Sequence, residues 1–316
     1  MNDLNITKLI ITTLLLMLST ACANSKQPQQ QIAEVSGTKN SVSNQQTVQA
    51  FNVVSRRILK SDGHDNGKTA YELITEFGGK RSIESPDLYS GNHTGQEHIY
   101  EAYDEMIGDH FVFVIHRDKD RDRDKLHITD RQRNEIKAHP NATADLKGFE
   151  NETMTYQWLF KANSEMELSK RFTHFFQLKA KGGNDQQPII TLSGAERSGE
   201  DGIEVRYHGG STDRRLLART PWEHVAGEWL NIYVRATFAE SASIRIIGIR
   251  VRDGKEVFNI DESGLDLWRG TDKSHFVRPK WGIYRSLMDK DNLRAEEEVA
   301  YFANFVVSKV IPNKQP

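Results

Sequence analysis

Apolar and polar residues alternate in several short segments of this chain. In residues 155–161 the side chains of Tyr156, Trp158 and Phe160 share one face of an extended strand, and the residues between them share the other. Short runs of this kind, divided by Gly, Asn and Asp, continue from residue 51 onward, and no segment keeps an apolar period of about 3.6 residues for long. The pattern predicts an all-β domain.

The strands predicted from these runs are distributed along the chain after residue 100. They are residues 110–116, 155–161, 172–181, 188–192, 203–208, 229–238, 244–252, 256–260, 277–285 and 299–308. So many strands in one domain indicate two packed, curved sheets with a concave face. Residues 71–74 fit a short helix and a strand equally well.

Three segments carry polar side chains on one strand face. In the first, alternation predicts one face with Thr173, Phe175, Gln177 and Lys179, and an opposite face with His174, Phe176 and Leu178. The other two segments give faces with Arg133, Glu135 and Lys137, and with Arg278, Lys280 and Tyr284. If these strands lie in one curved sheet, they line a groove with Arg, Gln, Lys and Tyr side chains.

Composition limits the partners of such a groove. The 316 residues include 42 Lys and Arg against 44 Asp and Glu, and the formal net charge is −2. This balance argues against a nucleic-acid-binding protein, which needs a cationic field to meet the phosphate backbone. An anionic ligand would therefore be met by a local cluster of cations. We expect one large β domain that is a monomer.

The N-terminal region has the layout of an export signal. Residues 9–18 are apolar, follow Lys8 and are too short for a permanent membrane span. The run ends near Cys22, the only cysteine, which resembles the lipidated first residue of a bacterial lipoprotein; Ala21-Cys22-Ala23 also suits cleavage without lipidation. The expected location is the cell envelope, as an outer-membrane lipoprotein held at the membrane by its lipid, or else secreted or periplasmic.

The domain organisation follows from this signal. We predict a signal peptide over residues 1–22 and a tether rich in Gln, Ser, Asn and Thr over residues 23–50, whose composition cannot bury enough surface to fold. Residues 51–316 form the folded domain. Because this domain contains no cysteine, it has no disulfide and no thiol nucleophile.

Metal-binding patterns are weak in this sequence. The 11 histidines contain no H-E-x-x-H or similar set, so a zinc enzyme is not expected. Asp118, Asp120, Asp122 and Asp124 alternate with Lys and Arg, and these cations together with a missing EF-hand glycine favour a solvated hairpin tip over a calcium loop.

One histidine stands beside other charged residues. His208 shares a predicted strand face with Glu204 and Arg206. Arg206 and His208 are candidates for contacts with a ligand, although a packed imidazole with no ligand explains His208 more simply.

Common hydrolase and nucleotide-binding motifs are absent. The sequence has no paired-carboxylate strand, no G-x-S-x-G elbow and no P-loop. The remaining polar set suits β-elimination of a uronic acid, which needs donors that neutralise the carboxylate, a base for the C5 proton and an acid for the C4 oxygen. Arg133 and Gln177 fit the first role, and Lys179 or Tyr284 fits the second if burial or Lys280 lowers its pKa. Ordinary polar residues on an exposed sheet face are the alternative.

Three of these segments also resemble a known family. ITDRQRNEIK (128–137), FTHFFQLKAKGG (172–183) and FVRPKWGIYRS (276–286) are similar to the signature strands of the jelly-roll polysaccharide lyases. The ulvan lyases and glucuronan lyases are the nearest, and heparin lyase I and the alginate lyases are further away. The resemblance covers most of the chain from about residue 71 to residue 305. It implies a concanavalin A-like β-jelly-roll sandwich and endo cleavage of an acidic polysaccharide that contains glucuronate, with ulvan favoured and glucuronan next.

The same resemblance implies roles for single residues. Alginate lyases of this architecture carry R-x-E-L-R, Q-I-H and K-A-G-x-Y, matched here by residues 133–137, 177–179 and 280–284. Lys179 stands where those enzymes have histidine, which looks more like an ulvan lyase. The implied roles are Arg133 and Gln177 at the uronate carboxylate, Lys179 as base or charge neutraliser, and Tyr284 as acid and also as base.

Further contacts and partners are implied in the same way. Glu135, Lys137 and Lys280 are expected to contact the substrate. No cofactor is required for this chemistry, and a structural calcium ion is common among such relatives, although the sequence does not locate one. A non-catalytic carbohydrate-binding protein on the same scaffold remains the alternative to an enzyme.

Overall fold

The computed structural model describes residues 51–210 and 212–313. The predicted signal peptide, Cys22 and the tether lie outside these residues. Within the described ranges no helix is long and apolar enough to cross a membrane.

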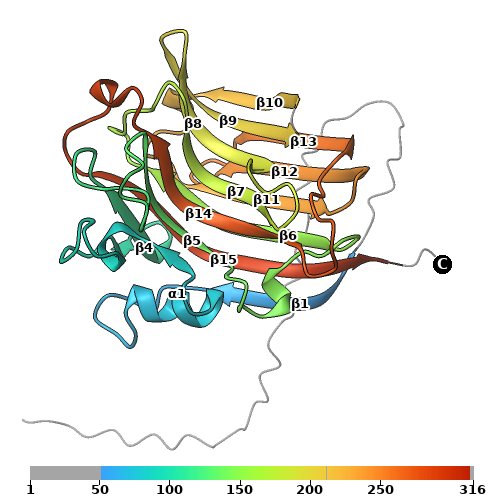
Figure 1. Cartoon of the computed structure of the whole chain (residues 1–316). Coiled ribbons are helices and arrows are strands. Elements are labelled where there is room, and N and C mark those ends of the chain that lie inside the picture. The colour runs from blue at the N-terminus through green and yellow to red at the C-terminus, as the bar shows by residue number, and fades with distance from the viewer. Residues whose placement is uncertain (1–50, 211, 314–316) are drawn as a thin grey trace, which may run out of the picture. The chain divides into compact units, whose positions relative to one another are not determined.

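Two antiparallel sheets pack against each other, and their strands curve (Figure 1). The eight-stranded sheet has the order β13-β12-β11-β6-β15-β4-β3, with β1 also paired to β15. Its strands are β1 (Phe51–Leu59), β3 (Ile99–Asp104), β4 (Gly108–Ile115), β6 (Thr153–Ala162), β11 (Leu230–Thr237), β12 (Ala242–Arg250), β13 (Glu256–Leu265) and β15 (Glu298–Pro312).

The seven-stranded sheet has the order β10-β9-β8-β7-β14-β5-β2. Its strands are β2 (Ile83–Glu84), β5 (Arg131–Lys137), β7 (Thr173–Lys181), β8 (Ile190–Arg197), β9 (Glu200–Gly209), β10 (Asp213–Pro221) and β14 (Phe276–Ser286). This sheet contains all three of the polar segments that the sequence predicts to line one surface.

One α-helix, α1 (Ala70–Gly78), lies among the described residues, and it answers the open question about residues 71–74. Thr69 begins it with a capping box, in which Thr69 Oγ1 accepts from the Glu72 amide and the Glu72 side chain accepts from the Thr69 amide. Ile74 and Phe77 face the core. Four short 3₁₀ turns are also present: η1 (Pro86–Leu88), η2 (Ala144–Leu146), η3 (Trp222–His224) and η4 (Lys290–Asn292).

The core lies between the two sheets, as the alternation in residues 155–161 predicts. Tyr156, Trp158 and Phe160 of β6 are at most 2% exposed. The Trp158 ring lies 4.5 Å from the Phe176 ring of β7 and 6.0 Å from the Trp281 ring of β14. Each buried aromatic of this kind stabilises the fold by about 2–3 kcal/mol through the area removed from water. The contacts of Trp158 with Phe176 and Trp281 therefore hold β7 and β14 of one sheet against β6 of the other.

All ten of the segments predicted as strands overlap observed strands, and β1, β2, β3 and β10 were not predicted. The strand β10 illustrates the reason. It is an edge strand, and Leu216 within it is 47% exposed, so no buried stripe marks it in the sequence.

The alternation predicted for residues 172–179 is wrong at its start. In the pairing of β7 with β8, His174 opposes Ser193 and Phe176 opposes Leu192, so Phe175 is an extra residue in a β-bulge. Its ring turns into the core, 4.8 Å from Phe160. The bulge reverses the alternation, which places His174 on the outer face.

Thr173 changes side for the same reason. It is fully buried and pairs with Arg285, which is also fully buried. The predicted outer face therefore keeps Gln177 and Lys179, loses Thr173 and Phe175, and gains His174.

A solvated hairpin tip for the four alternating aspartates is also wrong in part. Asp118 and Asp124 are exposed, but Asp120 and Asp122 are 0% and 2% exposed. Asp122 Oδ1 accepts a 2.7 Å hydrogen bond from Nε of Arg133, and Asp120 lies among three histidines. Asp120 and Asp122 point inward because buried histidines and Arg133 bind their carboxylates there.

Candidate active site

Strands β5, β14 and β7 are neighbours, and their register brings the predicted polar residues together. Tyr284 of β14 pairs with Arg133 of β5 on one side and with His174 of β7 on the other. Four residues earlier on β14, Lys280 pairs with Lys137 of β5 and with Gln177 of β7. Residues from three distant parts of the chain thus share one face of the sheet.

Beneath this face lies a buried network centred on Glu135. Its Oε2 accepts hydrogen bonds from Nη1 of Arg133 at 2.8 Å and from Nζ of Lys280 at 2.6 Å, and its Oε1 accepts one from Nε2 of Gln177. All four side chains are at most 8% exposed. Two of the predicted carboxylate ligands, Arg133 and Gln177, therefore hold a carboxylate of the protein itself.

Glu84 of β2 is a second centre of the network, and sequence reasoning missed it. Lys280 Nζ lies 2.7 Å from its Oε2, Arg123 Nη1 lies 2.7 Å from its Oε1, and Lys137 also donates to it. Burial alone raises the pKa of Glu84, but Lys280 and the neighbouring cations outweigh it and hold the pKa well below its usual value. The strand β2 has only two residues, so no alternation of apolar and polar residues in the sequence marks Glu84 as part of a strand face.

Cations outnumber carboxylates in this network. The carboxylates are Glu84, Asp122 and Glu135, and the cations are Arg123, Arg133, Lys137 and Lys280. Burial lowers the pKa of Lys280, and burial with nearby Lys280 helps lower that of Lys137 to about 8. Because the network is buried, solvent screens its excess of positive charge poorly. The sheet face above it therefore has a positive potential that favours one anionic group.

Tyr284 lies half-buried above the network. The guanidinium carbon of Arg133 is 3.9 Å from the centroid of its ring, which is a cation–π contact. Arg131 Nη1 donates a 3.2 Å hydrogen bond to the phenolic oxygen, and the Phe172 ring lies 5.2 Å away. These contacts fix the phenol and place a cation beside its oxygen.

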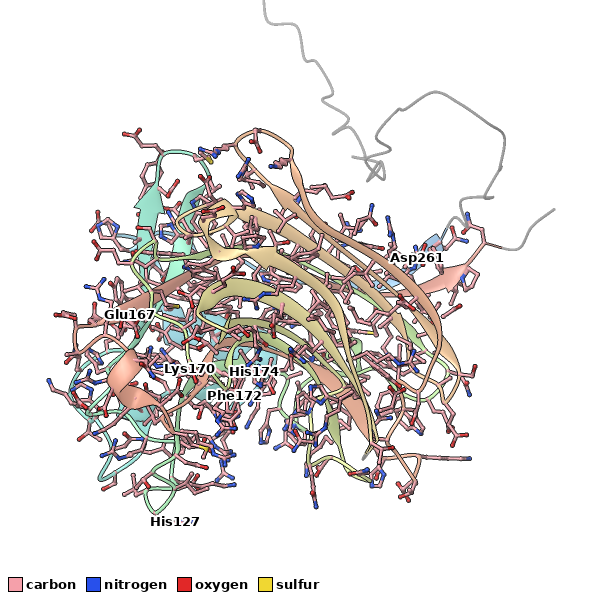
Figure 2. All side chains as sticks on the ribbon, turned by 90° about the horizontal axis from the view of Figure 1, so that it is seen from above. His127, Glu167, Lys170, Phe172, His174 and Asp261 are labelled. Carbon is pink, nitrogen blue, oxygen red and sulfur yellow. The ribbon has the colours of Figure 1, made fainter. Side chains whose placement is uncertain are left out.

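His174 adjoins Tyr284 and was not among the predicted site residues. Its ring stacks on Phe172 at 4.6 Å, at the start of β7 (Figure 2), and lies 5.9 Å from the Tyr284 ring. Its Nδ1 is 2.7 Å from Oγ of Ser193, whereas its Nε2 makes no hydrogen bond to the described part of the chain. Burial first, and then the nearby charges of His208 and Arg133, lower the pKa of His174 to about 3, so the imidazole is neutral at pH 7.

Lys179 lies at the far end of the same strand face. Its Nζ donates to the backbone oxygens of Asp185 at 2.6 Å and Gln186 at 3.0 Å. Burial and the neighbouring charge of Lys280 lower its pKa to about 8, so it is mostly a cation at pH 7.

The two residues predicted on β9 differ from each other. Arg206 donates through Nε to Glu204 at 2.6 Å, and Glu204 also binds Arg197 and Arg219, so Arg206 belongs to a separate ion-pair cluster. His208 is half-buried, and its buried Nδ1 has no hydrogen-bond partner. It alternates with Glu204 and Arg206 on β9, and Glu204 is the register partner of Ser193, which is itself the partner of His174, so His208 lies on the sheet face that carries His174.

Comparison with known proteins identifies the fold. No protein-family model matches this sequence, and no curated protein is significantly similar to it. Among solved structures, a variant of the alginate lyase Aly36B in complex with an alginate tetrasaccharide has a TM-score of 0.52 at 9% identity, over 82% of this chain and 98% of that one.

Two further solved structures are similar. A marine PL-14 alginate lyase from Aplysia kurodai has a TM-score of 0.51 at 12% identity, over 83% of this chain and 99% of that one. An endo-β-1,4-glucuronan lyase from the fungus Trichoderma reesei has a TM-score of 0.44 at 12% identity, over 72% and 95%. The all-β sandwich predicted from the sequence is confirmed: the chain has the jelly-roll fold of the Aly36B and Aplysia kurodai lyases.

Proposed function

We propose that this protein is a polysaccharide lyase that cleaves a uronate-containing acidic polysaccharide by β-elimination. The observation that carries the proposal is the pairing of Tyr284 with a neutral His174 above a buried network with excess positive charge. A carbohydrate-binding surface needs no such acid–base pair.

The buried network supports the first requirement of the reaction. Removing the C5 proton builds negative charge on the uronate carboxylate, and preorganised cations stabilise that charge best where water is excluded. Arg133 and Lys280 supply the positive field from below while bound to Glu135, and the neutral amide of Gln177 donates to the same carboxylate. Lys179, a half-buried cation, is the group we assign to direct contact with the carboxylate.

His174 suits the role of base for the C5 proton. When its Nδ1 donates to Ser193, its Nε2 carries the lone pair. In the free protein burial and the surrounding cations weaken this base, but a bound uronate carboxylate neutralises part of the cations' field and raises the pKa of His174. Lys179 is the alternative base, and it is less suited because its ammonium is mostly protonated at pH 7 and already donates to two carbonyls.

Tyr284 suits the role of acid. The electrons of the C5–H bond form the C4–C5 double bond as the C4–O4 bond breaks, the C5 proton goes to His174, and the phenol proton goes to the leaving oxygen O4. Arg131, which donates to the phenolic oxygen, is placed to stabilise the tyrosinate that results. Proton exchange with water then restores both groups.

The favoured substrate is ulvan, with glucuronan next, because Lys179 stands where related alginate lyases have histidine. Endo cleavage is expected from the resemblance to the jelly-roll polysaccharide lyases. The test is a panel of ulvan, glucuronan and alginate, followed through the ultraviolet absorbance of the conjugated double bond that only elimination creates. Absorbance growing on a glucuronate polymer supports the proposal. Binding without absorbance on any member of the panel would instead indicate a non-catalytic carbohydrate-binding protein.

We also propose that the protein is exported and held at a membrane by lipid on Cys22. This part of the proposal rests on the apolar run of residues 9–18 and the composition of residues 23–50. A tether of that kind would let the domain reach a polymer outside the cell.

A further inference from the structure

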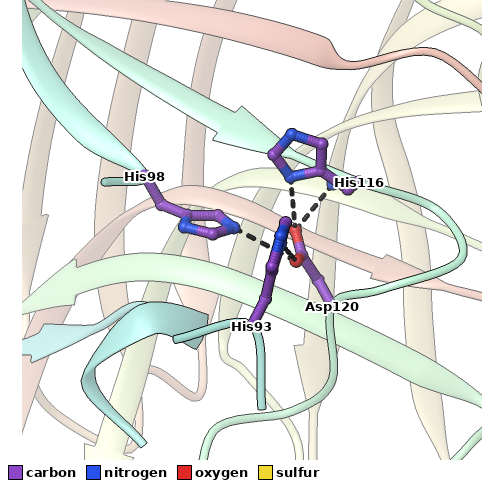
Figure 3. A group of neighbouring side chains, drawn as sticks. All are labelled: His93, His98, His116 and Asp120. Carbon is purple, nitrogen blue, oxygen red and sulfur yellow. Dashed lines mark hydrogen bonds and ion pairs between the residues drawn. The ribbon is translucent and has the colours of Figure 1, made fainter. Parts of the chain in front are cut away.

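Three imidazoles and one carboxylate converge at the end of β4, outside the network described above (Figure 3). They belong to His93, His98, His116 and Asp120, and one possible ligand atom from each lies within 4.8 Å of all the others. The three rings are mutually edge-on, with centroids 4.8–5.1 Å apart. His98 and Asp120 are fully buried, and His116 is 9% exposed.

Hydrogen bonds on the outer side of the cluster determine where two of the imidazole protons lie. His98 Nδ1 is 2.6 Å from the carbonyl oxygen of Gln96, which can only accept, so this nitrogen carries a proton and Nε2 faces Asp120 at 3.1 Å. His116 Nε2 is 3.0 Å from Oε2 of Glu297, so by the same reasoning it carries the proton and leaves a lone pair on Nδ1. The side-chain amide of Gln96 lies 3.1 Å from the same Nε2, and its oxygen end is the one that suits an N–H donor.

The inner nitrogen of His116 then has no suitable protein partner. His116 Nδ1 is buried, makes no hydrogen bond, and lies 3.4 Å from Oδ2 of Asp120, which is also an acceptor. Asp120 Oδ2 also accepts from the His116 backbone amide at 2.6 Å, so the buried nitrogen is the atom without a partner, and a cation between it and the carboxylate would satisfy both. His93 Nδ1, 2.8 Å from Asp120 Oδ1, points to the same place.

We propose that His93, His98, His116 and Asp120 bind one divalent transition-metal ion, for which zinc is the best fit. Three imidazole nitrogens and one carboxylate oxygen suit zinc, whereas calcium prefers six to eight oxygens. Zinc–nitrogen bonds of about 2.0–2.1 Å place tetrahedral ligands roughly 3.3 Å apart, so the most widely separated ligand atoms, up to 4.8 Å apart, approach each other by about 1.5 Å on binding.

The surroundings have the form expected of a metal site. Glu297 and Asp87 lie beside the outer nitrogens of His116 and His98, at 3.0 Å and 3.4 Å, where carboxylates typically orient metal-bound histidines. Four protein ligands leave no open position, which is typical of a structural site rather than a catalytic one. No spacing motif marks this cluster in the sequence, because its ligands come from separate loops and strand ends.

A metal ion at this cluster would stabilise the loop of residues 116–122, which contacts the buried network of the candidate active site. Asp120 is two residues before Asp122, whose carboxylate binds Nε of Arg133, and Gln132 of β5 donates to the His116 carbonyl at 2.9 Å. His93 and His98 precede β3, and His116 and Asp120 follow β4, so one ion would join two segments that no disulfide connects. This inference does not depend on the proposed reaction.

The test uses the purified mature protein, treated with EDTA, incubated with zinc chloride and desalted before metal analysis. We expect one zinc per chain in the wild type, and a rise in Tm on the order of 10 °C at large zinc excess. His93→Asn removes the least buried ligand, so it should fold normally while losing both the bound zinc and the rise in Tm. His127→Asn, at an exposed histidine outside the cluster, should keep both.

Cobalt provides a second readout, because tetrahedral Co²⁺ with nitrogen ligands absorbs strongly in the visible and surface-bound Co²⁺ does not. The wild type and His127→Asn should show these bands, and His93→Asn should not. A wild type that retains no zinc and shows no rise in Tm would overturn the proposal. Equal zinc retention and equal spectra in His93→Asn and the wild type would overturn it as well.

Discussion

His174 of β7 and Tyr284 of β14 are register partners whose ring centroids lie 5.9 Å apart. Strict alternation along β7 would place this histidine in the core. The bulge at Phe175 turns it outward instead, next to the phenol and above the buried network. The proposed acid–base pair therefore depends on this bulge and on the register shift between β14 and β7 that lies between Trp281 and Tyr284.

Glu135 should be important for stability as well as for the site. Glu135→Gln keeps the size of the side chain but leaves the buried cations Arg133 and Lys280 without their shared carboxylate oxygen. Removing one partner of a buried ion pair costs roughly 3–5 kcal/mol, so the midpoint of urea unfolding should fall markedly.

The matched control is Glu76→Gln, which removes the exposed ion pair between Lys68 and Glu76. Its unfolding midpoint should stay close to that of the wild type because exposed pairs contribute little. Equal midpoints for Glu135→Gln and Glu76→Gln would mean that the network contributes nothing to folding.

His174 should also make stability depend on pH. Its pKa is about 3 in the folded chain against 6.5 ordinarily, so the folded state disfavours the protonated form. The resulting stability is fully present above about pH 6.5 and is lost as the pH falls toward 3. Between pH 7 and pH 4 the wild type should lose more stability than His174→Gln, by on the order of 2 kcal/mol. Urea titrations at each pH measure this difference, and parallel losses in the two proteins would contradict a neutral, cation-surrounded His174.

Kinetics should separate the roles of His174 and Lys179. His174→Gln removes the base and should lower kcat by roughly 100-fold to 10000-fold with KM little changed. Lys179→Met removes a charge that holds the uronate before and during reaction, so it should raise KM and lower kcat together. The reverse pattern, with kcat preserved in His174→Gln and abolished in Lys179→Met, would identify Lys179 as the base.

Location can be tested independently of the chemistry. If lipid on Cys22 anchors the protein, Cys22→Ser should move it from the membrane fraction to the soluble fraction of fractionated cells. The folded domain has no other cysteine, so its activity should not change. Membrane association that persists in Cys22→Ser would refute lipidation at this residue.

Much of the site could be predicted because period-2 alternation holds in β5 and β14. Arg133 and Tyr284 pair across these strands without a register shift, so reading alternate residues gave the correct face. Alternation failed in β7 because of the bulge at Phe175, which no residue type in the sequence indicates. The bulge places Thr173, His174 and Phe175 on the faces opposite to those predicted.

Other parts of the site have no local signal in the sequence. Glu84 lies in a two-residue strand, and its partners are 39 to 196 residues away along the chain. Asp120 and Asp122 read as solvated because Lys and Arg surround them, yet their own partners, His98 and Arg133, come from elsewhere in the chain. Contacts that form only after the sheets pair are beyond what spacing can indicate.

The central claim is that Tyr284 takes part in β-elimination, and one measurement tests it most directly. Wild type and Tyr284→Phe are compared on the member of the uronate panel that the wild type cleaves, by the rate at which double-bond absorbance appears. Phenylalanine keeps the ring that packs on Arg133 but has no proton to give, so substrate binding should persist while the rate falls roughly 100-fold to 10000-fold. A rate near that of the wild type in a folded Tyr284→Phe protein would contradict this account of the site.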